Sequence, residues 1–296
     1  MQDLKGKTAF ITGGASGIGL GMARAFGRAG MNVVLADIDR AAAVAAADRL
    51  TAEQIKVQAV KADVASRGSI QAAALEAIAA FGKVHLVCNN AGVAVGGAIG
   101  DLTEQDWDWI IDVNLKGVVH GVETFAPLIA SHGEGGHIVN TASLAGLVCG
   151  PGSEPYSATK YAVVGMSEGW AQQLAPMGIG MSVLCPGYVR TRIVDSARTR
   201  QDRYGGGVAN APADPFSEAV RHGVETGVDP DIVGQRVLEA VIAKDLYIFT
   251  DPRFEPIVEM RFSAIRAGFA AAAASPALKS VKDWAPLGGF APPSEG

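Results

Sequence analysis

The sequence predicts an α/β fold: a doubly wound parallel sheet (Rossmann fold) with helices on both faces, in three α/β/α layers. Short apolar segments alternate with helical segments from residue 8 to residue 249, the pattern of a parallel sheet. Several apolar segments run directly into Gly, Asn, Asp or Ser, residue types that surround ligands at the carboxyl edge of such sheets. With 296 residues, 49% of them hydrophobic, the chain can bury one large core. We therefore expect one domain over residues 1–250 and a C-terminal extension over 251–296.

Strands are expected where apolar runs are short, and helices where apolar residues recur with a period near 3.6. The expected strands are 8–11, 32–36, 57–60, 84–88, 137–141, 180–184 and 246–249. The expected helices are a segment ending near Ala29, 40–52, 66–81, 103–132, one beginning near Pro155 or Tyr156, 229–244 and 251–274. Residues 193–227 lack periodicity and are predicted to form a substrate lid. Residues 275–296 are rich in Pro, Gly and Ala and should be irregular.

The first strand runs into a glycine-rich turn. The run Thr12 to Gly19 contains Gly13, Ser16, Gly17, Ile18 and Gly19, and a helical segment follows it directly. Glycines permit a tight turn, and the helix N-terminus behind them offers free N–H groups to a pyrophosphate. The alternative is a glycine turn that binds nothing.

The second strand ends at Asp37, 18 residues after Gly19. A carboxylate there can accept hydrogen bonds from the ribose hydroxyls of an adenosine and would repel a 2′-phosphate. No basic residue occupies position 16 or 38, although Arg40 is close. NAD is therefore expected rather than NADP, unless Asp37 only caps the next helix.

Two further strand ends carry candidate cofactor contacts. Asp63 and Val64 follow the third strand, where Asp63 could bind the adenine amino group, cap the helix 66–81, or do both. The fourth strand opens into Asn90, Ala91 and Gly92, whose small side chains would let a dinucleotide lie close. The alternative for this run is an ordinary Asn/Gly turn.

The fifth strand and the helix after it carry the candidate chemistry. Ser143 follows the strand end, while Tyr156 and Lys160 are four residues apart and so share one helix face. A neighbouring ammonium should lower the pKa of the tyrosine from its usual value near ~10, so that it can exchange a proton with an alcohol or carbonyl oxygen. Asn114 is a poor residue for a helix interior. It is either a neutral surface position or a point where the helix loosens and holds a water near the active site.

Composition excludes several classes of function. The net charge of −5, with no basic block, disfavours nucleic acid as a partner. The three cysteines, Cys88, Cys149 and Cys185, are too sparse for a disulfide framework or a zinc site, so no metal is expected. Cys88 and Cys185 should be buried strand residues. A strand begins almost at the N-terminus and no apolar run approaches ~20 residues, so we expect a cytoplasmic protein that does not enter a membrane.

In their order and spacing these motifs resemble the short-chain dehydrogenase/reductase family over residues 5–250. The matching residues are Thr12-Gly13, Gly17-Ile18-Gly19, Asp63, Asn89-Asn90-Ala91-Gly92, Asn114, Ser143, Tyr156, Lys160, Pro186-Gly187 and Thr191. The resemblance implies a catalytic tetrad and reversible hydride transfer between NAD(H) and a secondary alcohol or ketone. In that tetrad Tyr156 is the acid/base, Lys160 lowers its pKa and binds the nicotinamide ribose, Ser143 holds the substrate oxygen, and Asn114 supports a water connected to Lys160.

The resemblance also implies further contacts. It places Pro186, Gly187 and Val189 against the cofactor, and Thr191 on the nicotinamide carboxamide. It implies that the long helices around 103–132 and 156–176 pair into homodimers or homotetramers.

A finer resemblance concerns the substrate. The run Gly136 to Ser143, the ending Leu246-Tyr247-Ile248 and the pair Arg261-Phe262 resemble bacterial dehydrogenases that oxidise the benzylic secondary alcohol of lignin-derived aryl ethers. A bulky, aromatic substrate is expected, and a steroid or terpene alcohol is the main alternative. Apolar residues after Ser143 could line its pocket (Leu144, Leu147, Val148, Cys149). The stripe Phe254, Phe262 and Phe269 lines either that pocket or an interface. A catalytically inactive dinucleotide-binding protein, and an epimerase or lyase, are the alternatives of other classes.

Overall fold

The computed structural model of the chain describes residues 3–207 and 215–284. The chain divides into two compact units, Met1–Pro252 and Arg253–Gly296, and each unit is described by itself.

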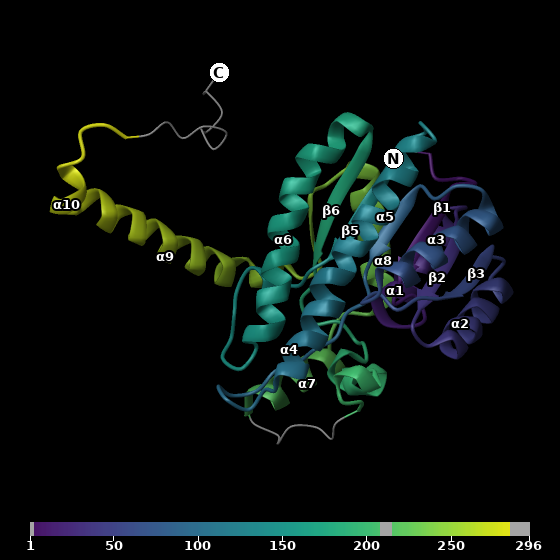
Figure 1. Ribbon diagram of the computed structural model, residues 1–296, viewed down its shortest axis with the longest axis horizontal. Helices are drawn as coiled ribbons and strands as arrows, with labels where there is room; N and C mark the ends of the chain where they lie inside the picture. Colours follow the sequence, from purple (N-terminus) through teal and green to yellow (C-terminus); the bar gives the residue numbers. More distant parts are fainter. Residues whose placement is uncertain (1–2, 208–214, 285–296) are drawn as a thin grey trace. The chain divides into compact units, whose positions relative to one another are not determined.

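The first unit is built on a seven-stranded sheet in the order β3-β2-β1-β4-β5-β6-β7, and its strand pairs are parallel (Figure 1). The strands are β1 (Thr8–Thr12), β2 (Asn32–Asp37), β3 (Val57–Lys61), β4 (Leu86–Asn89), β5 (Gly136–Thr141), β6 (Ile179–Cys185) and β7 (Tyr247–Phe249). The chain order reverses between β1 and β4, and ligands bind at such switch points in open sheets. The predicted Rossmann fold is confirmed.

Helices cover both faces of the sheet, because side chains alternate between the faces along each strand. On β1, Phe10 joins one buried cluster, whereas Ala9 and Ile11 join the other. The helices whose apolar residues join the Ile11 cluster are α1 (Gly17–Arg28), α2 (Arg40–Ala52) and α8 (Pro230–Ala243). Those that join the Phe10 cluster are α3 (Arg67–Phe81), α4 (Glu104–Ile111), α5 (Gly117–Ser131) and α6 (Glu154–Leu174). Cys88 and Cys185 are buried on β4 and β6, as predicted.

Helix caps decide between the two interpretations of Asp37 and Asp63. The N-cap of α2 is Asp39, whose side chain accepts from Ala42 N–H. The N-cap of α3 is Ser66. Neither Asp37 nor Asp63 therefore caps the helix that follows it, and the capping alternative is wrong for both.

The helical pattern predicted over 103–132 is one continuous helix with a widened turn. Between α4 and α5 lies a π-helical turn, Asp112–Lys116, with Asn114 at its centre. Asn114 is fully buried, so its interpretation as a surface position is wrong. The expected local loosening is present as this π turn.

The region 193–227 is more regular than its sequence indicates. It contains two 3₁₀ helices, η4 (Ile193–Thr199) and η5 (Asp202–Tyr204), and an α-helix, α7 (Pro215–Glu225). The 3₁₀ helices do not follow a 3.6-residue period, which explains why the pattern analysis missed them. Residues 208–214 of the predicted lid lie outside the described residues.

The described part of the second unit is helical. A 3₁₀ turn (η6, Pro252–Phe254) leads into α9 (Glu255–Ala274), which confirms the predicted helix. The expectation of irregular structure after 275 is wrong for α10 (Pro276–Lys279), where Pro276 occupies a favourable first helical position. Residues 285–296 lie outside the described chain. No helix in the described ranges is long and apolar enough to cross a membrane.

Candidate active site

The turn between β1 and α1 forms a cradle that side chains would fill. Gly13 and Gly17 have φ angles of +62° and +52°, which L side chains rarely adopt. A Cβ atom at Gly19 would lie only 2.2 Å from the Gly13 carbonyl oxygen. Ser16, the N-cap of α1, makes no side-chain capping bond with the described residues. Its helix N-terminus is therefore available to an anion such as a pyrophosphate.

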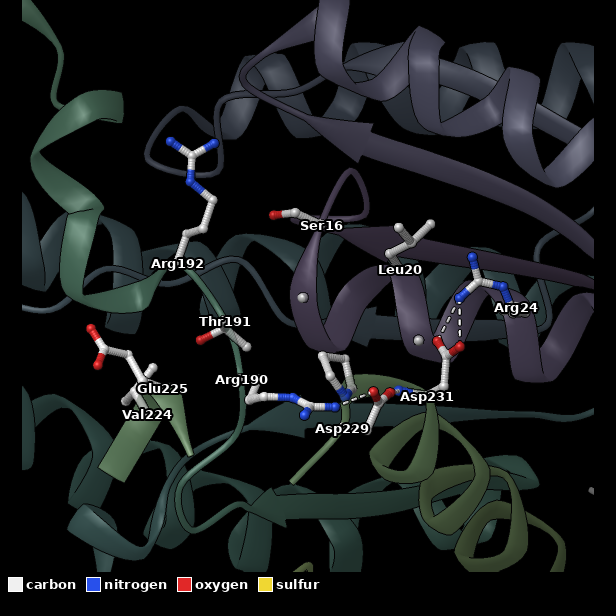
Figure 2. Close-up of a pocket in the computed structure, with 13 residues that line it drawn as sticks. Ser16, Leu20, Arg24, Arg190, Thr191, Arg192, Val224, Glu225, Asp229 and Asp231 are labelled. Carbon is white, nitrogen blue, oxygen red and sulfur yellow. Dashed lines mark hydrogen bonds and ion pairs between the residues drawn. The ribbon is translucent and has the colours of Figure 1, made fainter. Parts of the chain in front are cut away.

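A pocket of about 480 Å³ opens beside this turn (Figure 2). Ser16 and Gly17 line it from the turn, and Thr191 lines it from the segment after β6. A Cβ atom at Gly17 would lie 3.0 Å from Thr191 Cγ2, so Thr191 packs directly on the glycine turn. The described lining residues include none of the four predicted catalytic residues. The pocket therefore belongs to the predicted cofactor end of the site.

Asp37 lies at the end of β2 with both carboxylate oxygens bonded to backbone. Its Oδ2 accepts from Ala15 N–H (3.1 Å) and its Oδ1 from Asp39 N–H (3.1 Å). Burial raises the pKa of Asp37, while these hydrogen bonds and the positive charge of Arg198 act in the opposite direction. Arg198 belongs to η4, more than 150 positions away in the chain, so sequence reasoning missed it.

The Asp63 carboxylate is held by the same distant region. Arg203 Nη2 lies 2.8 Å from Asp63 Oδ2, and Gln201 Nε2 lies 3.4 Å from Oδ1. Val64, the next residue, is buried, and its carbonyl oxygen lies 2.9 Å from His120 Nδ1. The predicted adenine-binding carboxylate is thus already engaged by side chains of the chain itself.

The region that reaches Asp63 is fixed over the sheet edge by buried contacts. Ser196 is buried, and its Oγ accepts from Ala94 N–H (3.0 Å). Arg200 forms an ion pair with Asp106, and the Tyr204 hydroxyl donates to Asp112 Oδ2 (2.7 Å). Residues 193–204 are therefore packed on the loop after β4 and on the α4 side of the site.

Asn90 ties three neighbouring strand ends together. Its N–H donates to Thr12 Oγ1 (2.9 Å), and its Nδ2 donates to the Thr12 carbonyl (3.0 Å). The Thr141 hydroxyl donates to Asn90 Oδ1 (3.3 Å), and Ala91 N–H donates to Thr12 Oγ1 (3.0 Å). These hydrogen bonds join the ends of β1, β4 and β5. Thr12 belongs to the first motif of the resemblance, and Thr141, at the end of β5, is the further partner.

Asn114 holds the loop after β4 from inside the π turn. Its Oδ1 accepts from Val93 N–H (2.8 Å), and its Nδ2 donates to the Val93 carbonyl (2.9 Å) and to Thr159 Oγ1 (3.3 Å). A Cβ atom at Gly92 would lie 3.3 Å from Asn114 Oδ1 and 3.5 Å from Lys160 Nζ. Asn114 and Lys160 therefore flank Gly92, and both side chains are buried.

Lys160 and Tyr156 lie together on α6, as their spacing predicts. Lys160 Nζ donates to the Thr141 carbonyl (2.9 Å) and lies 5.5 Å from the centroid of the Tyr156 ring. Burial lowers the pKa of Lys160 to about 8. Burial also raises the pKa of Tyr156, although a hydrogen bond with Ser143 acts in the opposite direction. The predicted lowering of the tyrosine pKa is wrong, because the loss of hydration outweighs the hydrogen bond from Ser143.

Ser143 begins a short 3₁₀ turn after β5, with Oγ accepting from Ala145 N–H (3.1 Å). The next residue, Leu144, is buried in the core and donates its N–H to the Pro186 carbonyl (3.0 Å).

The remaining predicted cofactor residues lie along the same edge. Gly187 N–H donates to Thr250 Oγ1 (3.1 Å). Val189 is buried and forms a parallel bridge with Val228. Ile18 is half-buried on α1 and packs against the core.

Comparisons with known proteins agree with this geometry. A family profile described as short chain dehydrogenase matches residues 7–202. A C alpha-dehydrogenase of Sphingobium sp. (strain NBRC 103272 / SYK-6) is 38% identical over 269 residues, covering 90% of this chain and 87% of that protein. A 3beta-hydroxysteroid dehydrogenase 2 of Eggerthella lenta is 36% identical over 221 residues, covering 74% of this chain and 84% of that protein. A short chain dehydrogenase/reductase from Burkholderia phymatum, crystallised in complex with NAD, is 37% identical with a TM-score of 0.86, covering 90% of this chain and 97% of that one.

Proposed function

Because this chain belongs to the short-chain dehydrogenase family of oxidoreductases, we propose that it transfers a hydride reversibly between NAD(H) and a bulky secondary alcohol or its ketone. The observation that carries the proposal is the meeting of Ser143, Tyr156 and Lys160 beside Gly92 at the carboxyl edge of the sheet. A phenol, a hydroxyl and a buried ammonium at one point suit proton exchange with an alcohol oxygen.

Each side chain has a separate task in this proposal. Tyr156 gives its phenolic proton to the ketone oxygen in reduction and takes it back from the alcohol in oxidation. Ser143 binds the same substrate oxygen, since its hydroxyl already reaches the phenol. Lys160, held by the Thr141 carbonyl, keeps a positive charge near the phenol and orients the nicotinamide ribose. Asn114 acts as a positioning residue, because it fixes the backbone at Val93 next to the site.

The residues present fit a nicotinamide dinucleotide. The cradle of Gly13, Gly17 and Gly19 leaves room for a pyrophosphate at the α1 N-terminus. When bound, the nicotinamide accepts or supplies the hydride. We assign the ribose hydroxyls to Asp37, whose charge disfavours a 2′-phosphate, and hence propose NAD rather than NADP as the cofactor.

The remaining predicted contacts belong to the same proposal. The adenine is assigned to Asp63 and Val64. The nicotinamide end is assigned to Thr191 with Pro186, Gly187 and Val189.

For the substrate we propose the benzylic secondary alcohol of an aryl ether. The support is the similarity to a C alpha-dehydrogenase over nine-tenths of the chain, together with the motifs in β5 and β7. A steroid alcohol is the second candidate, favoured by the 36% identity to a 3beta-hydroxysteroid dehydrogenase. Both substrates are bulky and carry a secondary hydroxyl. We propose that the 193–227 region covers them as a lid, that the enzyme acts in the cytoplasm, and that it forms a homo-oligomer.

The proposal is tested with a panel of alcohols in the presence of NAD⁺ or NADP⁺, measuring the nicotinamide absorbance. 1-Arylpropanols and aryl ethers should exceed 2-propanol in kcat/KM by about 10²-fold or more, since each buried CH₂ contributes roughly 0.8 kcal/mol. Tyr156→Phe keeps the ring but removes the proton, and should lower kcat at least ~10²-fold with NADH binding retained.

Other outcomes would refute parts of the proposal. Equal rates with small aliphatic alcohols would exclude the bulky substrate, and a preference for 3β-hydroxysteroids would select the second candidate. Substrate conversion without net NADH would indicate an epimerase or lyase. NADH binding without any turnover would indicate an inactive dinucleotide-binding protein.

A further inference from the structure

Within the second unit, the described residues leave an apolar face of helix α9 uncovered. Within the described residues, none of the side chains of α9 is buried. Phe262, Ile265 and Phe269 are 42%, 41% and 75% exposed, and Val258 is half-buried. These four residues are spaced by four, three and four positions, so on a helix they form one straight seam. Such a seam is stabilised when a second helix packs along it.

The charges beside the seam are self-complementary. On a 3.6-residue helix, Glu259 and Arg266 flank the seam on one side, and Arg261 flanks it on the other. Consider first two copies of α9 in parallel. Parallel pairing brings positions on opposite sides of the seam together, which sets Arg261 against the partner's Arg266. That arrangement is repulsive.

Antiparallel pairing gives the opposite result. A two-fold axis between residues 263 and 264 sets Val258 against the partner's Phe269, and Phe262 against the partner's Ile265. In this arrangement, flanking residues on the same side of the seam meet. Glu259 of each copy then faces the partner's Arg266, which gives two contacts between opposite charges in the symmetric pair. The apolar contacts and the opposite-charge contacts therefore favour the same antiparallel register.

We propose that α9 is a homotypic association element that pairs with α9 of a second copy of this chain in an antiparallel helix pair. A membrane surface is the main competing occupant for an amphipathic helix. α9 carries two acidic and two basic residues, Glu255, Glu259, Arg261 and Arg266, so its net charge is zero. It therefore lacks the basic face that binds anionic lipids, and the observations favour a second copy.

The test uses two charge reversals in the full chain, Glu259→Arg and Arg266→Glu, measured by light scattering and analytical ultracentrifugation. Each variant alone places like charges at both flanking contacts, so its assembly mass should be half that of the wild type and its dissociation constant at least about tenfold higher. An equimolar mixture of the two variants places opposite charges at both contacts, so the wild-type mass should return.

The mixture separates this pairing from a role within one helix. Glu259 and Arg266 also form an ion pair within the same α9, and mixing two variants cannot restore that pair in either chain. Ala267→Arg and Ala267→Glu are the controls, since residue 267 lies on the side of the helix away from the seam, and both should keep the wild-type mass. Circular dichroism checks that every variant retains its helices.

Three results would overturn the proposal: unchanged mass in both reversal variants, no recovery in the mixture, or equal dissociation in the Ala267 controls. Binding of the wild-type chain to phosphatidylcholine vesicles, with loss of the association, would assign the seam to a lipid surface instead.

Discussion

The contact between Arg203 and Asp63 leads to a prediction about cofactor affinity that has a definite sign. Asp63 is the residue assigned to the adenine, yet its Oδ2 is 2.8 Å from Arg203 Nη2. The adenine amino group, if it binds Oδ2 of this carboxylate, competes with Arg203 for the same oxygen. Arg203→Ala should therefore tighten NADH binding, because the competing contact is absent before the cofactor arrives.

The size of the effect follows from the exposure of the pair. The Arg203 side chain is 47% exposed and the Asp63 side chain 18%, so the pair is partly solvated and screened. Exposed ion pairs contribute about 0.2–1 kcal/mol, which corresponds to a Kd lower by roughly 1.5-fold to 5-fold. The loop should keep its place in this variant, because Arg200 and Tyr204 retain their own bonds to Asp106 and Asp112.

The assay is a fluorescence titration with NADH, and the chain offers a matched control. Arg67 pairs with Glu123 and is also 47% exposed, so Arg67→Ala should leave Kd unchanged. In an Asp63→Ala background the Arg203→Ala effect should disappear. Weaker NADH binding in Arg203→Ala would refute the reasoning and indicate that Arg203 contacts the cofactor. An unchanged Kd would show that Arg203 does not compete with the cofactor for Asp63.

Three further predictions concern selectivity and pH. Asp37→Asn, which keeps one side-chain oxygen as an acceptor, should raise kcat/KM with NADP relative to NAD at least ~10-fold, because the charge that repels a 2′-phosphate is lost; an unchanged ratio contradicts the assignment. Because burial raises the pKa of Tyr156, kcat/KM for alcohol oxidation should rise about tenfold per pH unit across the neutral range; a flat profile would exclude the phenol as base. His137 is buried with its pKa lowered to about 3, so the unfolded chain binds a proton that the folded chain does not, and stability should fall by about 1.4 kcal/mol per pH unit as pH drops from ~6.5 toward 3. In urea titrations, the free energy of unfolding of His137→Gln should depend less steeply on pH than that of the wild type, by the slope that one proton contributes. An identical pH slope in the two proteins would show that His137 is not its source.

Local sequence determined much of the fold and the identity of the candidate catalytic residues. The apolar runs that became strands, the glycines of the first turn and the four-residue spacing of Tyr156 and Lys160 are all short-range features. The strands were predicted from short apolar runs, and the Tyr156–Lys160 pairing from helical geometry, so neither requires knowledge of distant residues. The long helical pattern also contained Asn114, a poor residue for a helix interior, and Asn114 lies at the centre of the π turn.

Only the tertiary structure decided which distant groups meet these residues. Gln201 and Arg203 contact Asp63, and the charge of Arg198 acts on Asp37, from more than 130 positions away. The 3₁₀ helices that carry Arg198 and Arg203 have no helical period in the sequence. The direction of the pKa shift of Tyr156 was also decided by the tertiary structure. Burial of the phenol depends on all the residues packed around it, whereas the sequence shows only the neighbouring lysine. The hydrogen bonding of helices and the periodicity of side chains depend on residues a few positions apart. The desolvation of a side chain and the long-range ion pairs arise only when the sheet edge brings separate loops together.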